Sequence, residues 1–190
     1  FKNENNNWNQ IGSSIYGLNS NDLCGASISL SSDGLIVAIG STGNDDGGDD
    51  SGHVRIFQNN NNAWEQIGSD IRGVNSGDSS GNSVNLSADG SFLAIGANLN
   101  DENGTSSGHV RVFQNNNGSW DQVGSSVEGE SLGDSSGDSV AISHTDDGKI
   151  ILAIGASQND GNGTNSGQVR LFKLDEFDPT LKVSNPAPND

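Results

Sequence analysis

Apolar and polar residues alternate in short runs that recur three times along the chain, which predicts β-strands rather than helices. In the run Ser83–Ser87, Val84 and Leu86 alternate with polar residues, as expected for a strand with one buried face. Matching runs lie at residues 27–31 and 139–143. No segment keeps a helical period, and glycine interrupts every run. We therefore expect an all-β protein.

Two further strands are expected in each repeat. The run Phe92–Gly96 is bulky at Leu93 and Ile95 and nearly bare at Ala94 and Gly96. A bare face allows a neighbouring sheet to approach closely. An Asp-Gly pair, a strong signal for a tight hairpin, precedes this strand in each copy. The matching runs are 36–40 and 151–155, and the last strand of each repeat is expected at 53–57, 109–113 and 168–172.

The repeat has a fixed period. Trp8, Trp64 and Trp120 each open a motif Trp-x-Gln-(Ile/Val)-Gly and fall 56 residues apart. A period of this length indicates a solenoid, propeller or array. We expect three tandem units of about 56 residues within residues 1–173, beginning near these tryptophans, and we take Trp64–Ile71 as the first strand of its unit.

Four short antiparallel strands per unit favour β-propeller-type blades, with a parallel β-helix as the second choice. Because closed propellers have about 4–8 blades, three blades predict a partial or open propeller, completed by further blades or by copies of the chain. Phe1 reads as the last residue of a strand whose beginning is missing. Residues 174–190, which contain all three prolines, are interpreted as a terminal strand or linker.

Composition restricts the partners. The chain has 25 Asp and Glu against 8 Lys and Arg, a net charge of −17. This balance excludes nucleic acid and anionic membranes, which bind clustered basic residues, and suits divalent cations or basic partners. No apolar run approaches the roughly 20 residues of a membrane-spanning helix. The single cysteine, Cys24, allows no internal disulfide; it replaces Ser80 and Ser136 of the other copies and is read as a small packing residue.

The repeated motifs resemble the FG-GAP repeats of integrin-alpha-type β-propellers. The residues that carry this likeness are Gly81-Asn-Ser-Val84, Ala88-Asp-Gly90, Ala94-Ile-Gly-Ala97 and Gly108-His-Val-Arg-Val-Phe113. The long acidic calcium loop of that family is reduced here to the Asp-Gly hairpin, where one carboxylate cannot supply the 6–8 oxygens of a calcium site. The resemblance implies an extracellular or cell-surface adhesive or scaffolding module rather than an enzyme.

Calcium is expected, if anywhere, in the loops between the third and fourth strands. These loops place Asn and Asp side chains two residues apart among glycines, as calcium loops do, although such residues also make ordinary surface turns. The candidate ligands are Asp45, Asp46, Asp49, Asp50, Asp101, Asn103, Asp160 and Asn162.

Acidic and basic positions also recur together. Asp22, Asp78 and Asp134 precede the second strand of each copy, and Arg55, Arg111 and Arg170 lie inside the fourth. An arginine in each strand is unusual in so acidic a chain. We therefore predict one structural Asp–Arg ion pair in each blade, bidentate where geometry permits.

Other recurring residues carry weaker signals. The tryptophans are interpreted as packing between blades, with sugar stacking as the alternative. His53 and His109 are equivalent, but the third copy has Gln168, and a surface or strand-edge position is expected for the histidines. No Ser/His/Asp or paired acid–base arrangement emerges. Acceptor triplets for N-glycosylation that fit exposed loops lie at Asn103, Asn117 and Asn162.

These patterns together favour an extracellular module without enzymatic activity, which binds a protein partner through its loops and is stiffened by calcium. A carbohydrate-binding, lectin-like propeller is one alternative, with a glycan at a cell surface or matrix as its partner. A repeat component of a surface coat or filament, docking through its open ends, is another.

Overall fold

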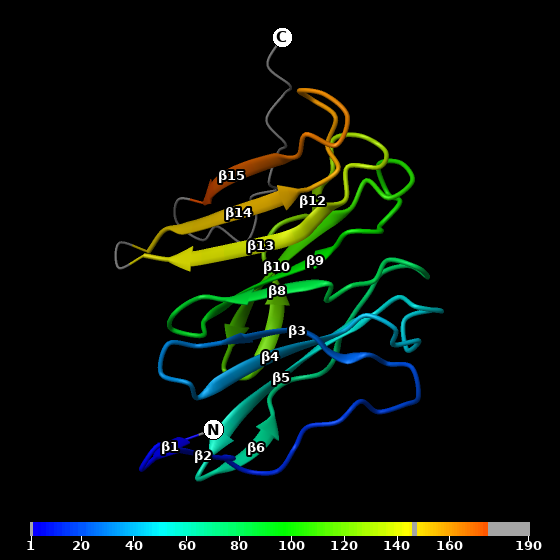
Figure 1. The fold of residues 1–190 in the computed structure, drawn as a ribbon. Helices are drawn as coiled ribbons and strands as arrows, with labels where there is room; N and C mark the ends of the chain where they lie inside the picture. The colour runs from blue at the N-terminus through cyan, green and yellow to red at the C-terminus, as the bar shows by residue number, and fades with distance from the viewer. Residues whose placement is uncertain (1, 146–147, 175–190) are drawn as a thin grey trace.

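The computed structural model describes residues 2–145 and 148–174 (Figure 1). These residues form β-strands joined by turns, and they contain no helix. Accordingly, the described part of the chain has no helix long and apolar enough to cross a membrane. The predicted all-β class is confirmed. The expectations for Phe1 and for residues 175–190 lie outside the described residues.

Three antiparallel sheets repeat one plan. The first has the strand order β3-β4-β5-β6, the second β8-β9-β10-β11 and the third β13-β14-β15. In the first two sheets a short extra strand, β7 or β12, also pairs with β5 or β10. The first-sheet strands are β3 (Cys24–Leu30), β4 (Ile36–Ser41), β5 (His53–Asn60), β6 (Ala63–Gln66) and β7 (Ile71–Arg72).

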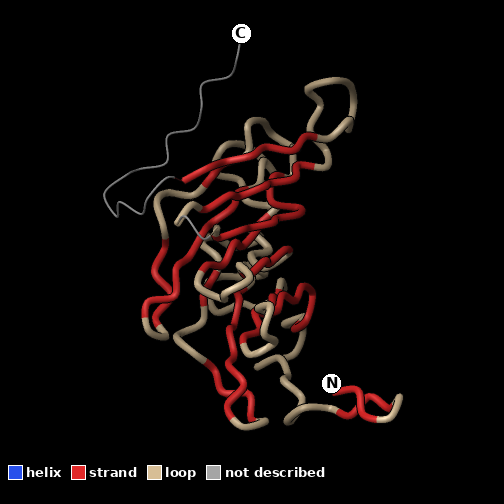
Figure 2. Tube along the Cα trace, turned by 90° about the vertical axis from the view of Figure 1, so that its left-hand side faces the viewer, coloured by secondary structure: helices blue, strands red, loops and turns tan. Residues whose placement is uncertain are grey.

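The second sheet comprises β8 (Ser83–Leu86), β9 (Phe92–Ala97), β10 (His109–Asn116), β11 (Ser119–Gln122) and β12 (Val127–Glu128). The third comprises β13 (Ser136–His144), β14 (Ile150–Ala156) and β15 (Gln168–Leu174). A separate hairpin of β1 (Lys2–Glu4) and β2 (Asn7–Asn9) stands away from the sheets near the N-terminus (Figure 2).

The sheets follow one another in chain order, from the β3 sheet to the β13 sheet (Figure 1). Their first strands adjoin: β3 contacts β8, and β8 contacts β13. Successive sheets are also joined by parallel bridges, Gly52 to Ser80 and Gly108 to Ser136. The three sheets therefore form one continuous stack with the same junction used twice.

The strand that contains the repeated tryptophan belongs to a different sheet from the one expected. Trp64 pairs with Asn59 of β5, and Trp120 pairs with Asn115 of β10. The tryptophan strand therefore closes the preceding sheet instead of opening the next one. Alternation of apolar and polar residues predicts that a segment is a strand, but it does not predict which of two neighbouring sheets the strand joins.

The cores lie between the sheets. Ala38, Val54 and Ile56 of the first sheet pack against Val84 and Leu86 of the second. Ala94 and Val110 repeat this arrangement on the other side of the second sheet, against Ile142, Leu152 and Ile154 of the third. Burial of both faces of a four-stranded sheet explains why its strands carry apolar residues on both sides.

Glycine allows the close approach predicted from the bare face of the third strand. A Cβ atom placed on Gly96 would lie 2.1 Å from the carbonyl oxygen of Gly137, on the next sheet. Gly40 has the same relation to Gly81, also at 2.1 Å. The same carbonyls accept hydrogen bonds from serine hydroxyls, Ser83 to Gly137 at 2.6 Å and Ser27 to Gly81 at 2.7 Å. No residue with a side chain fits at these junctions without moving the backbone.

Gly96→Ala tests this junction against a matched control. Overpacking against a backbone carbonyl that cannot rotate away is expected to destabilise the protein by about 1–3 kcal/mol. In the control, Gly155→Ala, the added Cβ meets the Ser139 hydroxyl at 2.3 Å but no carbonyl of another sheet. Urea unfolding at low protein concentration, where contacts between copies of the chain do not contribute, should show a larger loss for Gly96→Ala; equal losses would contradict the close-approach argument.

Candidate functional site

Two buried histidines are the first residues of β5 and β10, in the first and second sheets. The side chains of His53 and His109 are 0% and 3% exposed, so the expected surface position is wrong. His53 pairs with Arg72 of β7, and His109 pairs with Glu128 of β12. The short strands β7 and β12 therefore shield the two histidines from solvent. The sequence of β5 or β10 alone gives no sign of this pairing.

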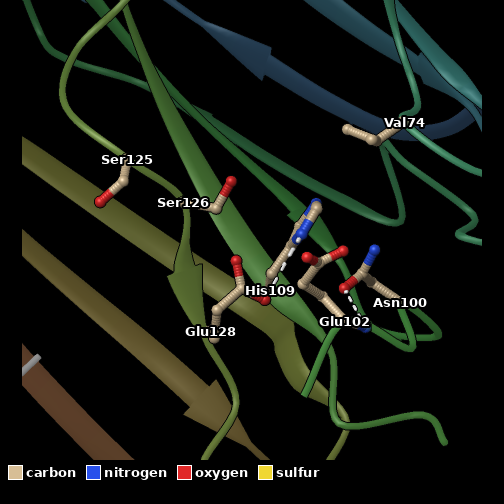
Figure 3. A pocket seen from close by; sticks show the side chains of 7 residues that line it. All are labelled: Val74, Asn100, Glu102, His109, Ser125, Ser126 and Glu128. Atoms are coloured by element: carbon tan, nitrogen blue, oxygen red, sulfur yellow. Dashed lines mark hydrogen bonds and ion pairs between the residues drawn. The ribbon is translucent and has the colours of Figure 1, made fainter. Parts of the chain in front are cut away.

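The second-sheet histidine opens onto a cavity of about 490 Å³ (Figure 3). Its Nδ1 lies 3.8 Å from the Glu128 carboxylate, and Glu102 extends toward it from the β9–β10 loop. Nε2 of His109 and Oε2 of Glu128 are buried without a hydrogen-bond partner. The cavity is lined by Val74, Asn100, Glu102, His109, Ser125, Ser126 and Glu128.

Burial sets the charge of this pair. It lowers the pKa of His109 to about 4, with a smaller effect of the nearby Arg111. Burial also raises the pKa of Glu128, and repulsion from Glu102 adds to the rise. Desolvation disfavours the charged form of each group. His109 is therefore neutral at pH 7 and available as an acceptor or metal ligand.

The first sheet gathers a tighter group. The ligand atoms of Asp46, His53 and Asp70 all lie within 4.8 Å of one another, and no other group of at least three such residues occurs within residues 2–145 and 148–174. His53 Nδ1 is 3.9 Å from the Asp70 carboxylate. Burial lowers the pKa of His53, although Asp70 partly offsets this.

In the third sheet Gln168 replaces the histidine and donates a hydrogen bond of 2.9 Å to Glu130. The histidine position is therefore polar in all three repeats. Only the first two repeats have an imidazole there that could bind a metal ion.

The predicted calcium loops use their carboxylates to shape turns. Asp45, Asp101 and Asp160 each accept a hydrogen bond from the backbone N–H five residues later, at 2.9, 2.7 and 2.7 Å. Asn103 donates to the Gly129 carbonyl, and Asp46 joins the histidine group. Asp49, Asp50 and Asn162 are exposed. Among the candidate ligands within the described residues, only Asp46 belongs to a group of three side chains close enough to share one metal ion. Calcium in these loops stays a prediction.

The recurring Asp and Arg residues have separate partners. No ion pair joins Asp22, Asp78 or Asp134 to Arg55, Arg111 or Arg170 among the pairs within 4.0 Å in the described structure. The aspartates instead accept hydrogen bonds from buried asparagines: Asn44 to Asp22 at 3.1 Å, Asn100 to Asp78 at 3.0 Å and Asn159 to Asp134 at 3.0 Å. The predicted direct ion pairs are therefore wrong.

Each arginine donates a hydrogen bond to a side chain at the start of its own sheet and another to a backbone carbonyl in the segment before that sheet. Arg111 donates to the Arg72 carbonyl at 2.7 Å and to the Ser80 hydroxyl at 3.1 Å. Arg170 makes the same bond to Ser136, and Arg55 reaches the Cys24 sulfur at 3.5 Å. Cys24 is thus the sulfur counterpart of a serine that accepts from arginine. Guanidinium groups bind carbonyls as well as carboxylates, so recurrence alone did not identify the partner.

The tryptophans divide into two kinds. Trp64 and Trp120 pack against apolar clusters, and Trp64 donates to the Ile11 carbonyl at 3.1 Å. Trp8, on the separate hairpin, is 69% exposed. Packing therefore accounts for two of the three positions, and a row of three exposed aromatic platforms is not formed.

A Ser/His/Asp cluster that the sequence did not reveal forms at the opposite end of the second and third sheets. Ser91 donates to Asp89 at 2.7 Å, and His144 Nδ1 lies 2.8 Å from Asp89 and 3.2 Å from Ser91. One nitrogen thus faces both partners, whereas a catalytic triad needs the two histidine nitrogens to face different groups. Burial tends to raise the pKa of Asp89, but hydrogen bonds from Ser87, Ser91 and His144 outweigh it and lower that pKa.

The glycosylation candidates lie in turns. All three are exposed, and the side-chain nitrogen of Asn103, the atom that would carry the sugar, donates to the Gly129 carbonyl at 2.7 Å. Glycosylation of Asn103 would therefore require this hydrogen bond to break.

Comparisons with known proteins yield no family. No protein-family model matches the chain, and no curated protein matches its sequence. The likeness to FG-GAP repeats therefore rests on the repeated motifs alone.

His109→Gln tests the buried histidine through pH. Unfolded histidine binds a proton below about pH 6.5, whereas folded His109 does so only near pH 4. The unfolded state thus gains protons first as pH falls, and this site lowers the free energy of unfolding by about 2–3 kcal/mol between pH 7 and pH 4. The variant carries the glutamine of the third repeat and should lack that loss.

Urea unfolding of both proteins at pH 7 and pH 4.5 measures the difference. Arg111, Asp78 and Glu128 face His109 and are retained in the variant, so their titration is largely common to both proteins. Parallel pH profiles would show that the imidazole is not held neutral by burial.

Proposed function

We propose that the chain is a scaffolding module, an open arc of β-propeller-type blades, that assembles head to tail through the faces of its two outermost sheets. One observation carries this proposal: the two outer faces are the separated halves of an interface that the chain forms twice internally. The partner is a like sheet, supplied by a second copy of the chain.

The internal interface defines what each half looks like. One half is the β4–β5 face, represented by Val54 and Ile56, both 0% exposed. The other half is the first strand of the next sheet, represented by Val84 and Leu86, which pack against them. Both halves are apolar and neither contains a charged residue at these positions.

In the two outermost sheets, the residues at the same positions are exposed to solvent. Val169 and Leu171, the counterparts of Val110 and Val112, are 70% and 73% exposed on the third sheet. Ile28 and Leu30, the counterparts of Val84 and Leu86, are 62% and 56% exposed on the first. Contiguous exposed apolar surface of this kind marks an interaction site.

The glycines indicate that the occupant is another sheet of the same kind. Gly155, the counterpart of Gly96, has the room for a neighbouring carbonyl, yet a Cβ placed on it meets only Ser139. Gly25, the counterpart of Gly137, has nothing within 4 Å of such a Cβ. Both ends therefore keep the backbone shape of the junction. Docking Gly25 of one copy against Gly155 of another would reproduce the internal contact.

Charge affects the conditions of assembly. Each copy carries −17, so two copies repel one another at low ionic strength. Salt screens exposed charges with a Debye length of about 8 Å at 0.15 M. Association through apolar faces should therefore strengthen as salt is added, opposite to association through charged loops.

Two single substitutions and their mixture test the head-to-tail geometry. Ile28→Asp disables the first-sheet face, and Leu171→Asp disables the third-sheet face. Each variant alone should remain monomeric in sedimentation velocity at 0.15 M salt, because its intact face finds no complementary one. An equimolar mixture retains one working pair of faces and should form a one-to-one dimer and nothing larger.

Leu132→Asp is the matched control, because Leu132 is a 74% exposed leucine that lies beside Gly104 in the loop between β12 and β13, and not in β3 or β15. It should assemble like the unaltered chain. A mixture that stays monomeric, or a single variant that dimerises with itself, would contradict head-to-tail docking. An unaltered chain that stays monomeric at high concentration and salt would contradict assembly altogether.

A further inference from the structure

We propose that Asp46, His53 and Asp70 form a binding site for a divalent transition metal of the zinc class. The three side chains come from the β4–β5 loop, the start of β5 and the segment before β7. Their ligand atoms lie within 4.8 Å of one another. This site is separate from the outer faces through which the chain is proposed to assemble.

The histidine supplies evidence beyond the acidic cluster. His53 is fully buried, and neither of its ring nitrogens has a hydrogen-bond partner. Buried polar groups are nearly always paired, so an imidazole with two unpaired nitrogens requires an explanation. Its Nδ1 faces the Asp70 carboxylate at 3.9 Å, too far for a hydrogen bond. A metal ion between the two groups would supply the missing partner of Nδ1.

The carboxylates are already oriented by other groups. Gln66 donates to Asp70 at 2.7 Å, and Arg72 lies 3.6 Å from Asp46. Hydrogen bonds to ligating carboxylates are usual in metal sites. The Arg72 side chain is 55% exposed and can turn toward solvent as a cation approaches Asp46.

The donor set selects the metal. One nitrogen and two carboxylate oxygens suit Zn²⁺, with a water or a ligand in the fourth position. Calcium prefers 6–8 oxygen ligands. Ligand atoms around one tetrahedral zinc lie about 3.4 Å apart, so binding requires the group to contract. Asp46 lies on an exposed loop that can accommodate this movement.

The second repeat provides an internal comparison. Glu102 and His109 stand at the positions of Asp46 and His53, but Ser126 replaces Asp70 and Glu128 replaces Arg72. The ligand atoms of His109, Glu102 and Glu128 do not all lie within 4.8 Å of one another, as those of the first group do. We therefore expect one metal ion per chain, at the first repeat.

Binding of Zn²⁺ and Co²⁺ to the full chain, followed by calorimetry and by visible absorption, tests the site. One equivalent should bind, the midpoint of thermal unfolding should rise, and Co²⁺ should show the absorption of a nitrogen–oxygen tetrahedral site. His53→Gln should weaken binding by at least about tenfold, since even outer-shell changes cost 10–100-fold. Asp70→Asn should weaken it similarly and leaves the buried imidazole in place.

His109→Gln is the matched control, because it removes the equivalent imidazole from the repeat that lacks Asp70. It should keep the full affinity. Absence of saturable binding to the unaltered chain would overturn the proposal. So would equal affinities in the His53→Gln, Asp70→Asn and His109→Gln proteins, or tighter binding of Ca²⁺ than of Zn²⁺.

Discussion

The close approach of one sheet to the next, at positions where only glycine fits, is the constraint on which the rest of the structure depends. Gly40 and Gly96 lie against the carbonyls of Gly81 and Gly137. This contact fixes the distance between sheets, and that distance decides which apolar side chains fill the space between them. The serine hydroxyls that donate to the same carbonyls satisfy groups that would otherwise be buried without a partner.

A polar layer accompanies this apolar one. Asp78 and Asn100 are buried together, with the asparagine amide donating to the carboxylate and its oxygen accepting from the backbone of Glu102. Arg111 ties the same sheet to the preceding strand. Because every repeat has this arrangement, the long loops are held to the strands by hydrogen bonds as well as by packing. The Asp–Asn pairs of this layer favour one arrangement of the loops, because separating them would leave buried polar groups without partners.

The sequence predicts the strands well because each strand carries its own signal. The alternation at Val84 and Leu86, the Asp-Gly turns and the bare face at Gly96 are local properties, and the structure agrees with them. Properties that depend on distant segments were not predicted. The burial of His53 depends on β7, and the contact between Asp89 and His144 joins two repeats at a position where the third copy has extra residues.

The strand that carries Trp64 completes the sheet before it rather than the one after it. The sequence repeat of about 56 residues, counted from its tryptophan, is therefore shifted by one strand relative to the sheets of the structure. A fragment that runs from one tryptophan to the residue before the next would begin with the last strand of the preceding sheet. It would lack the last strand of its own sheet. Neighbouring units interlock in this way, which couples their unfolding and makes the array more cooperative than a row of self-contained sheets.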